Sequence, residues 1–443
     1  MHLPPADVKD GDADAYKVSK RYAWLVFGMT FLLMLFDFID RQIIVSMFPH
    51  LKAEWDLSDK QLGALVSAVS LTVALGSIPT AILVDRWSRV KSIAIMAGVW
   101  SLATIACAFS RNYGQLLAAR SVIGVGEAGY GAAGGALLSS IFPARMRSTV
   151  LGAFLAAASL GSVLGVILGG VIATHWGWRA AFGVVGIPGL VLALLFLLVR
   201  DYKTVRLVQP GGSGSALGAK GALALLFRPR TVIAMCLGGA MQLFVVGTIY
   251  AWLPSFLNRF YGLAPDQAGI KAAIVVLLGA IGSVVWGLVA DRMGRSRPRA
   301  KITTLAVLSV GTTVVFVTAF GFMAPGNGQF ALIALGGFLM TATVGPVGAV
   351  TIDVVHPGLR ATAAATVALF QNLLGLAAGP FVAGVLSDAL GLQAAMAITP
   401  FACLLAALAF VAAARSYEPD LAKVGDLDVE MDGAPLRAAP VAA

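Results

Sequence analysis

Apolar residues run along this chain in twelve long stretches, and short polar segments that carry most of the charged side chains separate them. A hydrocarbon layer of about 30 Å takes about 20 helical residues to cross. The stretches reach that length, so the pattern predicts twelve membrane-spanning helices. The predicted spans lie near residues 22–48, 61–84, 92–110, 115–140, 148–174, 180–199, 230–257, 267–290, 302–323, 329–353, 361–387 and 392–414.

The composition agrees with this pattern. Hydrophobic residues make up 58% of the 443 residues, and charged residues only 12%, whereas soluble domains carry about 25% charged residues. A globule with so little charge cannot cover its surface with polar groups, which excludes a water-soluble enzyme. The predicted fold class is therefore an all-α polytopic membrane protein.

The net charge of +10 reflects topology. Twenty-four of the 32 Lys and Arg residues fall on one alternating set of loops, and five fall on the opposite set. Such a bias marks the cytoplasmic side, so we expect an inner (plasma) membrane protein with both termini in the cytoplasm. It gives no reason to expect a nucleic-acid partner. Residues 1–20 lack the apolar core of a signal peptide, so the first span is expected to be uncleaved.

The chain repeats itself in two halves. The loop with Asp85, Arg86 and Arg89 recurs 206 residues later with Asp291, Arg292 and Arg295. A Gly-rich linker, Gln209 to Ser215, lies between the halves. Parallel six-span halves with related loops are a transporter architecture. The predicted parts are a tail at 1–21, a six-helix bundle at 22–199, a linker at 200–229, a six-helix bundle at 230–414 and a tail at 415–443.

These loops resemble the Gly-x-x-x-Asp-Arg-x-Gly-Arg motif of the major facilitator superfamily. The copy from Gly287 to Arg295 is complete, and the first copy has Ala81 and Ser88 in place of its two glycines. The fourth span matches the motif Arg-x-x-x-Gly-x-Gly from Arg120 to Gly126. The resemblance covers residues from about 20 to 415 and implies the major facilitator fold, with alternating access and a gating role for the two charged loops.

Within the superfamily the chain resembles the Spinster family most. The matching runs are Asp40-Arg-Gln-Ile43, Leu57-Ser-Asp-Lys-Gln-Leu-Gly63, Gly124-Val-Gly-Glu-Ala128 and Gly177-Trp-Arg-Ala-Ala-Phe182. Asp37 departs from that family, which usually has Asn there. The anion:cation symporters also carry an Asp-Arg pair in the first span and a Glu in the fourth, so they are the second resemblance.

Five ionisable residues lie well inside the predicted spans of the first half: Asp37, Asp40, Arg41, Arg120 and Glu127. Charges in a bilayer are costly, so such residues are functional candidates by default. At 1.5 Å per helical residue, Asp40 and Arg120 lie at similar depths below the outer face, and Glu127 lies two turns deeper. We therefore expect Arg120 to approach Asp40, and Glu127 to lie near the midplane.

This arrangement suggests proton coupling. Burial disfavours an ionised carboxyl and a nearby guanidinium favours it, so Glu127 and Asp40 are the predicted protonation sites. Arg120 and Arg41 are predicted as their charge partners or as an anion site, because guanidinium pairs with carboxylate or phosphate. The plainer alternatives are a fixed pair between Glu127 and Arg120 and a local i,i+4 pair between Asp37 and Arg41.

The function expected from the sequence is proton-coupled secondary transport of an amphiphile or organic anion by alternating access. The alternatives are an uncoupled facilitator and a proton symporter for small carboxylates or sugar acids. Motifs for a catalytic serine, a zinc protease or an ATP-binding loop are absent, so we expect no enzyme activity, cofactor or metal. The expected partners are the substrate, protons and the bilayer, and the chain is expected to act as a monomer.

Overall fold

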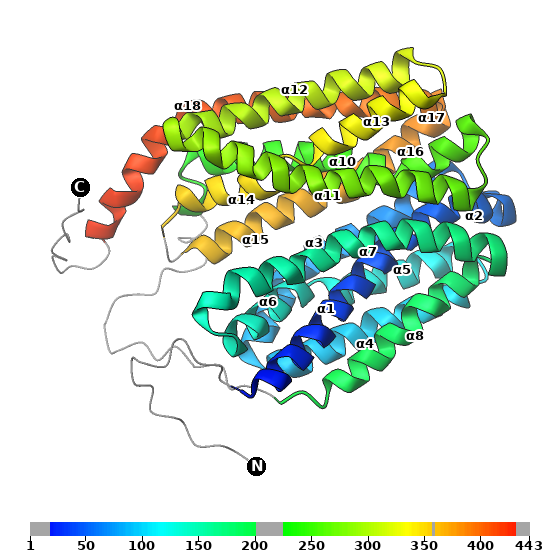
Figure 1. Cartoon of the computed structure of the whole chain (residues 1–443), viewed down its shortest axis with the longest axis horizontal. Helices are drawn as coiled ribbons and strands as arrows, with labels where there is room; N and C mark the ends of the chain where they lie inside the picture. The colour runs from blue at the N-terminus through cyan, green and yellow to red at the C-terminus, as the bar shows by residue number, and fades with distance from the viewer. Residues whose placement is uncertain (1–17, 201–224, 357–358, 431–443) are drawn as a thin grey trace. The chain divides into compact units, whose positions relative to one another are not determined.

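The computed structural model describes residues 18–200, 225–356 and 359–430, and every regular element in these ranges is a helix (Figure 1). The first ten helices are α1 (Lys20–Ile43), η1 (Ile44–Met47), α2 (Phe48–Trp55), α3 (Asp59–Arg86), α4 (Arg89–Ala108), α5 (Tyr113–Glu127), α6 (Tyr130–Ile141), η2 (Ala144–Met146), α7 (Arg147–Trp176) and α8 (Trp178–Phe196). The helices that follow the linker are α10 (Arg230–Tyr261), α11 (Pro265–Ser296), α12 (Pro298–Phe322), α13 (Asn327–Met340), α14 (Val344–Asp353), α15 (Arg360–Phe370), η4 (Gln371–Ala377), α16 (Ala378–Leu390), α17 (Leu392–Ile398), η5 (Thr399–Phe401) and α18 (Ala402–Glu430).

The helices follow the predicted spans closely. Eleven helical segments of the described ranges are long and apolar enough to cross a membrane. The predicted span 115–140 is missing from this set because it is divided into α5 and α6, which have 15 and 12 residues. The last helix continues to Glu430, past the predicted end at 414.

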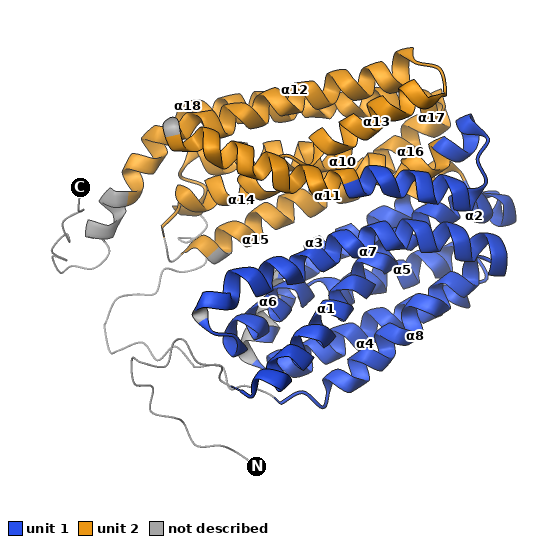
Figure 2. Cartoon of the chain, viewed as in Figure 1, with its two compact units in different colours: residues 1–57, 64–206, 257–277 blue, residues 58–63, 207–256, 278–443 orange. Residues whose placement is uncertain are grey.

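The chain packs into two compact units, coloured separately in Figure 2. Unit 1 comprises residues 1–57, 64–206 and 257–277, and unit 2 comprises residues 58–63, 207–256 and 278–443. All five charged residues predicted inside the spans of the first half belong to unit 1.

Glycines bring α7 against α1 in unit 1. A Cβ added at Gly161 would lie 2.5 Å from the carbonyl oxygen of Leu35, and one added at Gly165 would lie 2.7 Å from that of Ile39. Gly169 meets the carbonyl of Ile43 in the same way. Small residues four apart therefore let two helix backbones touch, and they fix the position of the segment of α1 that carries the charged residues.

Unit 2 repeats this contact with its own helices. A Cβ at Gly375, in η4, would lie 2.9 Å from the carbonyl oxygen of Ala240 in α10, and Gly379 meets the carbonyl of Phe244. The η4 segment is a π-helix, a wide turn that its counterpart in α7 lacks. Thus the internal repeat of the sequence is present in the helix packing, and the two copies differ by the π-helical turn that precedes α16.

The turns before the sixth and twelfth predicted spans are also repeated. Gly177 and Gly391 have φ angles of 83° and 86°, in the region that favours glycine. Two residues after each, a side chain donates to a carbonyl of a neighbouring helix end: Arg179 to Ser110 and Gln393 to Phe320, at 3.2 and 3.1 Å.

The first turn of α3 is held in unit 2 by Asp388 of α16. The two carboxylate oxygens of Asp388 accept hydrogen bonds from the backbone N–H groups of Asp59 and Lys60, each at 2.8 Å. The hydroxyl of the neighbouring Ser387 donates to the Asp59 carboxylate. A carboxylate at a helix N-terminus satisfies free amides and faces the positive end of the helix dipole. Asp388 is therefore a capping residue.

We expect Asp388→Ala to lower the free energy of unfolding by about 0.5–2 kcal/mol, the cost of losing a helix cap. Asp388→Asn keeps one acceptor oxygen and is expected to fall between the alanine variant and the wild type. Thermal unfolding of the three purified proteins in one detergent measures the order. Equal unfolding temperatures for all three would show that the cap contributes nothing.

Candidate functional site

One face of α1 carries three of the five buried charges. Ser19 caps this helix by accepting a hydrogen bond from the backbone N–H of Tyr22, and the helix then runs to Ile43 without a break. Asp37, Asp40 and Arg41 are spaced i, i+3 and i+4, which places them on neighbouring positions of one surface.

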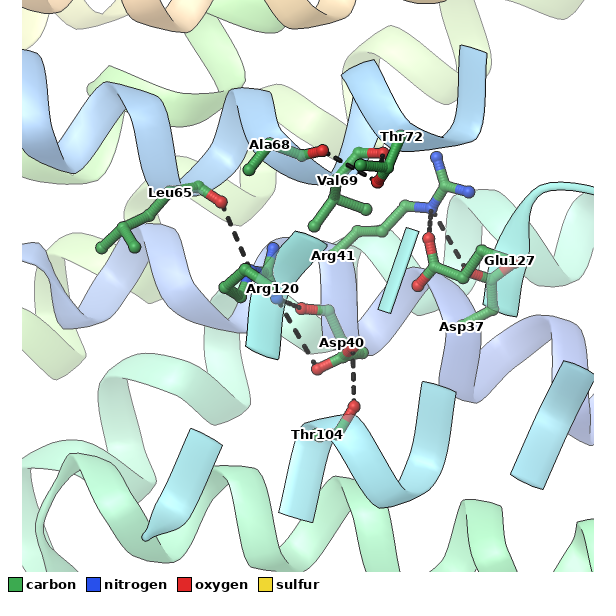
Figure 3. Close-up of polar contacts among 10 residues, drawn as sticks. All are labelled: Asp37, Asp40, Arg41, Leu65, Ala68, Val69, Thr72, Thr104, Arg120 and Glu127. Carbon is green, nitrogen blue, oxygen red and sulfur yellow. Dashed lines mark hydrogen bonds and ion pairs between the residues drawn. The ribbon is translucent and has the colours of Figure 1, made fainter. Parts of the chain in front are cut away.

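Arg41 lies between two carboxylates (Figure 3). Its Nε donates to Oδ1 of Asp37 at 3.2 Å and lies 2.9 Å from Oε2 of Glu127 on α5. The side chains of Asp37 and Glu127 are 4% and 0% exposed, whereas that of Arg41 is 18% exposed. Glu127 is therefore a fully buried carboxyl whose cationic partner among the described residues is Arg41.

The outer edge of the Arg41 guanidinium is not used by these contacts. Both carboxylates approach Nε, and Figure 3 shows the two terminal nitrogens directed away from them. Phe38 lies beside the group, with its ring centre 5.1 Å from the guanidinium carbon. Two terminal nitrogens in one plane form the fork that binds carboxylate or phosphate in bidentate fashion. Within the described part of the chain, Arg41 thus has partners for its charge at Nε and an edge that is open to an anion.

Arg120 is sealed inside the unit. Its Nη1 donates to the carbonyl of Asp40 at 3.1 Å and lies 3.8 Å from Oδ1 of that residue, while its Nε donates to the carbonyl of Leu65 at 3.4 Å. The second carboxylate oxygen of Asp40 accepts a hydrogen bond of 2.9 Å from the hydroxyl of Thr104. Arg120 and Asp40 are each 1% exposed, so this pair joins α1, α3, α4 and α5 rather than facing a ligand.

Glycines packed against other helices lie on both sides of the helix break after Glu127. A Cβ at Gly126 would lie 2.8 Å from the backbone nitrogen of Trp100 in α4, and Gly124 meets Thr72 and Val69 of α3. Gly129 occupies the turn between α5 and α6, where a Cβ would be 3.0 Å from the hydroxyl of Thr80. Glu127 therefore stands at the end of a helix that its neighbours hold closely.

One expected ion pair among the charged residues of unit 1 is not formed. Arg120 lies beside Asp40, as their depths suggested, but the pair expected between Arg120 and Glu127 is not formed. Arg120 and Glu127 both belong to α5, seven residues or about 10 Å apart along its axis, and Arg41 of α1 reaches Glu127 instead. Thr104 carried no signal in the sequence, since one hydroxyl in an apolar span is ordinary.

The two motif loops are described unequally. The side chains of Asp85 and Arg86 lie outside the described residues, and Arg89 begins α4 after its capping residue Ser88. In the second copy, Asp291 pairs with Lys301 of α12 at 2.9 Å. Arg292 and Arg295 are exposed. Their gating role stays a prediction.

Taken together, the buried cluster of unit 1 contains three carboxyls and two guanidiniums. Among the described residues, no group of three His, Cys, Asp or Glu side chains has the arrangement of a metal site. The chemistry available to the cluster is exchange of a proton at a carboxyl and pairing of an anion with a guanidinium.

Comparison with known proteins identifies the family. The model of the Major Facilitator Superfamily matches residues 30–375 and 244–439. Protein spinster of Drosophila melanogaster is 26% identical over 84% of this chain, which spans 63% of that protein's length. The hexuronate transporter of Bacillus subtilis is 24% identical, with 90% of this chain and 96% of that protein covered. The gallate transporter of Pseudomonas putida is 28% identical, with 73% and 79% covered.

A solved structure has the same fold. The crystal structure of a bacterial homologue of the human lysosomal transporter Spinster gives a TM-score of 0.82 at 22% identity, with 91% of this chain and 99% of that chain covered. This likeness and the family match confirm the all-helical membrane fold, and the match to protein spinster confirms the resemblance to the Spinster family. The chain belongs to the Major Facilitator Superfamily and is a membrane transporter, not an enzyme.

Proposed function

We propose that this protein is a proton-coupled secondary active transporter of an organic anion that works by alternating access. The observation that carries the proposal is the placement of Arg41, which contacts the buried carboxylates of Asp37 and Glu127 through Nε and whose terminal nitrogens have no acidic partner among the described residues. In this proposal Arg41 binds the anionic group of the substrate, and Glu127 beside it binds the proton.

The balance of charge supports proton uptake. With every group ionised, Asp37, Asp40 and Glu127 outnumber the two arginines by one negative charge in a largely buried setting. Removing charges from water is costly unless they are compensated. One proton on a carboxyl makes the cluster neutral, so binding of that proton is favoured. Glu127 is the proposed site for it because Asp40 already has Arg120 and Thr104 as partners. Asp40 is the second proposed protonation site.

An anion at Arg41 strengthens the same tendency. The anion brings another negative charge next to Glu127, which favours the protonated carboxyl. Linkage is reciprocal, so a bound proton raises the affinity for the anion by the same factor. Substrate and proton are then bound and released together, which is the thermodynamic basis of symport. Asp37 shares Arg41 with Glu127 and is proposed to hold the guanidinium while Glu127 is protonated.

The relatives support an anionic substrate. Two of them are named as transporters of hexuronate and gallate, both organic acids. The second candidate substrate is an amphiphile whose charged headgroup binds at Arg41. Arg120 is not proposed to contact substrate in either case, because it is sealed. The loops of Asp85 and Asp291 are proposed as gates, in a monomer with both termini in the cytoplasm.

The proposal is tested by transport driven by an imposed pH gradient in proteoliposomes, with labelled glucuronate, gallate and lysophosphatidic acid as probes. The wild type is expected to accumulate at least one of them above equilibrium. Glu127→Gln is expected to lose this accumulation while it still exchanges the probe across the membrane. Accumulation by Glu127→Gln at the wild-type level would reject Glu127 as the coupling site, and exchange without accumulation in the wild type would indicate an uncoupled facilitator.

Glu418→Gln is the matched control. Glu418 pairs with Arg299 at 2.9 Å, and both side chains are about half exposed, at 46% and 51%. Exposed pairs contribute little, so the same substitution there is expected to leave gradient-driven accumulation unchanged.

A further inference from the structure

Tyr130 is a buried residue that neither the motifs nor the charge pattern singled out. It is the first residue of α6, three positions after Glu127, and it is 0% exposed. Its hydroxyl donates a 2.5 Å hydrogen bond to the carbonyl oxygen of Thr30 on α1. Its ring packs edge-to-face on Trp100 of α4 and Phe154 of α7, with centroid distances of 5.2 and 6.2 Å.

The tie made by Tyr130 has a counterpart on the other side of the helix break. Arg120, seven residues before Glu127, donates to the carbonyl of Asp40 on α1 at 3.1 Å. One hydrogen bond joins Tyr130 to Thr30 and the other joins Arg120 to Asp40. Their positions are ten residues apart in each segment, or about 15 Å along a helix, and the two segments run antiparallel. The break at Ala128 and Gly129 lies between the two hydrogen bonds.

This arrangement determines where Glu127 sits. A helix interrupted by a two-residue turn has no continuous ladder of hydrogen bonds to keep its two parts aligned. Arg120 fixes the α5 side of the break to α1, and Tyr130 fixes the α6 side. Asp37 and Arg41, the partners of Glu127, are on the same α1 surface. A change in either tie therefore changes the distance between Glu127 and Arg41.

We propose that Tyr130 is a positioning residue for Glu127, which acts through its hydrogen bond to the Thr30 carbonyl and keeps the carboxyl against Arg41. The inference rests on the proposed protonation of Glu127. The charged groups that face Glu127 in the described part of unit 1 are Asp37, Asp40 and Arg41, all on α1. Tyr130 itself bears no charge and its hydroxyl is bonded to the Thr30 carbonyl, so its main effect on the titration of Glu127 is through geometry.

The test replaces Tyr130 with phenylalanine, which keeps the ring and removes the hydroxyl. Infrared difference spectra of the full-length protein in lipid, recorded against pH, follow the protonated carboxyl band that Glu127→Gln removes. We expect Tyr130→Phe to move the midpoint of this band by up to about one pH unit, the equivalent of one hydrogen bond. An unmoved midpoint in the folded variant overturns the inference.

A second measurement needs no titration. Thermal unfolding of Tyr130→Phe, Glu127→Gln and the double variant forms a cycle, and residues that act on one site give non-additive shifts. We expect the shift in unfolding temperature of the double variant to differ from the sum of the two single-variant shifts. Additive shifts overturn the inference. If Glu127→Gln removes no band, the proposed function fails at that point, and this cycle alone decides the role of Tyr130.

Tyr417→Phe is the matched control. Tyr417 donates a hydrogen bond of 3.1 Å to Asp353 and is also buried, at 6% exposure, but it belongs to α18 in unit 2. Loss of its hydroxyl is expected to lower the unfolding temperature while the Glu127 band keeps its midpoint. A shift of the midpoint in this control as large as in Tyr130→Phe would show a general effect of destabilisation and would also overturn the inference.

Discussion

Arg41→Ala is expected to abolish transport and to destabilise the protein strongly. The substitution leaves Asp37 and Glu127 in a buried site without their cation, and removing one partner of a buried pair costs about 3–5 kcal/mol. It also removes the guanidinium that is proposed to bind the substrate. Thermal unfolding and uptake of glucuronate, gallate and lysophosphatidic acid by reconstituted protein measure the two losses separately.

Arg41→Lys separates charge from shape. Lysine keeps the positive charge for the carboxylates but has no planar fork. We expect it to fold at nearly the wild-type temperature and to bind the anion weakly, because one charged hydrogen bond is worth about 1.5–3 kcal/mol, or roughly ten- to over a hundredfold in Kd. Arg111→Ala, at an exposed arginine in a loop, is the control. Wild-type stability and uptake in Arg41→Ala would remove Arg41 from both roles.

Gly165→Leu is expected to prevent folding, and Gly165→Ala to displace α1. Even a single added carbon at Gly165 would lie 2.7 Å from the carbonyl oxygen of Ile39 and 2.9 Å from Cβ of Gln42. Ile39 and Gln42 flank Asp40 and Arg41, so the steric clash displaces the segment of α1 that carries the site. Overpacking costs about 1–3 kcal/mol for small additions. Expression, thermal unfolding and transport of the two variants show the graded loss.

The same helix offers a control of opposite sign. Gly152 also lies in α7, and a Cβ added there would have no atom within 4 Å. Alanine is favoured over glycine in a helix by about 0.5–1 kcal/mol, so Gly152→Ala is expected to be neutral or stabilising. If Gly165→Ala were as well tolerated as Gly152→Ala, close contact between α1 and α7 would not be needed.

Much of the fold followed from the sequence because its causes are local. The number of spans follows from runs of apolar residues, and the repeat follows from two charged loops at a constant offset. Gly161, Gly165 and Gly169 of α7 are spaced four apart on one helix face, a pattern typical of close helix packing. The similar depth of Arg120 and Asp40 followed from the fixed rise of a helix.

The details of the site were less accessible because they depend on rotation and on partners far apart in the chain. The pairing of Arg41 with Glu127 depends on how α1 and α5 are turned, and glycine contacts such as that of Gly165 hold α1 in its position. The break after Glu127 depends on the packing of Gly126 and Gly129. Thr104 and Tyr130 act through hydrogen bonds to α1 that leave no pattern in the sequence.

The central claim, that an anion and a proton move together through Glu127, is tested most directly by proton movement without an imposed gradient. Proteoliposomes in weakly buffered medium with a pH dye receive glucuronate, gallate or lysophosphatidic acid in turn. The account predicts that at least one anion enters wild-type vesicles and makes the outer medium more alkaline, while Glu127→Gln vesicles exchange that anion with no change in pH. Entry into wild-type vesicles without proton movement, or an equal pH change with Glu127→Gln, would contradict it.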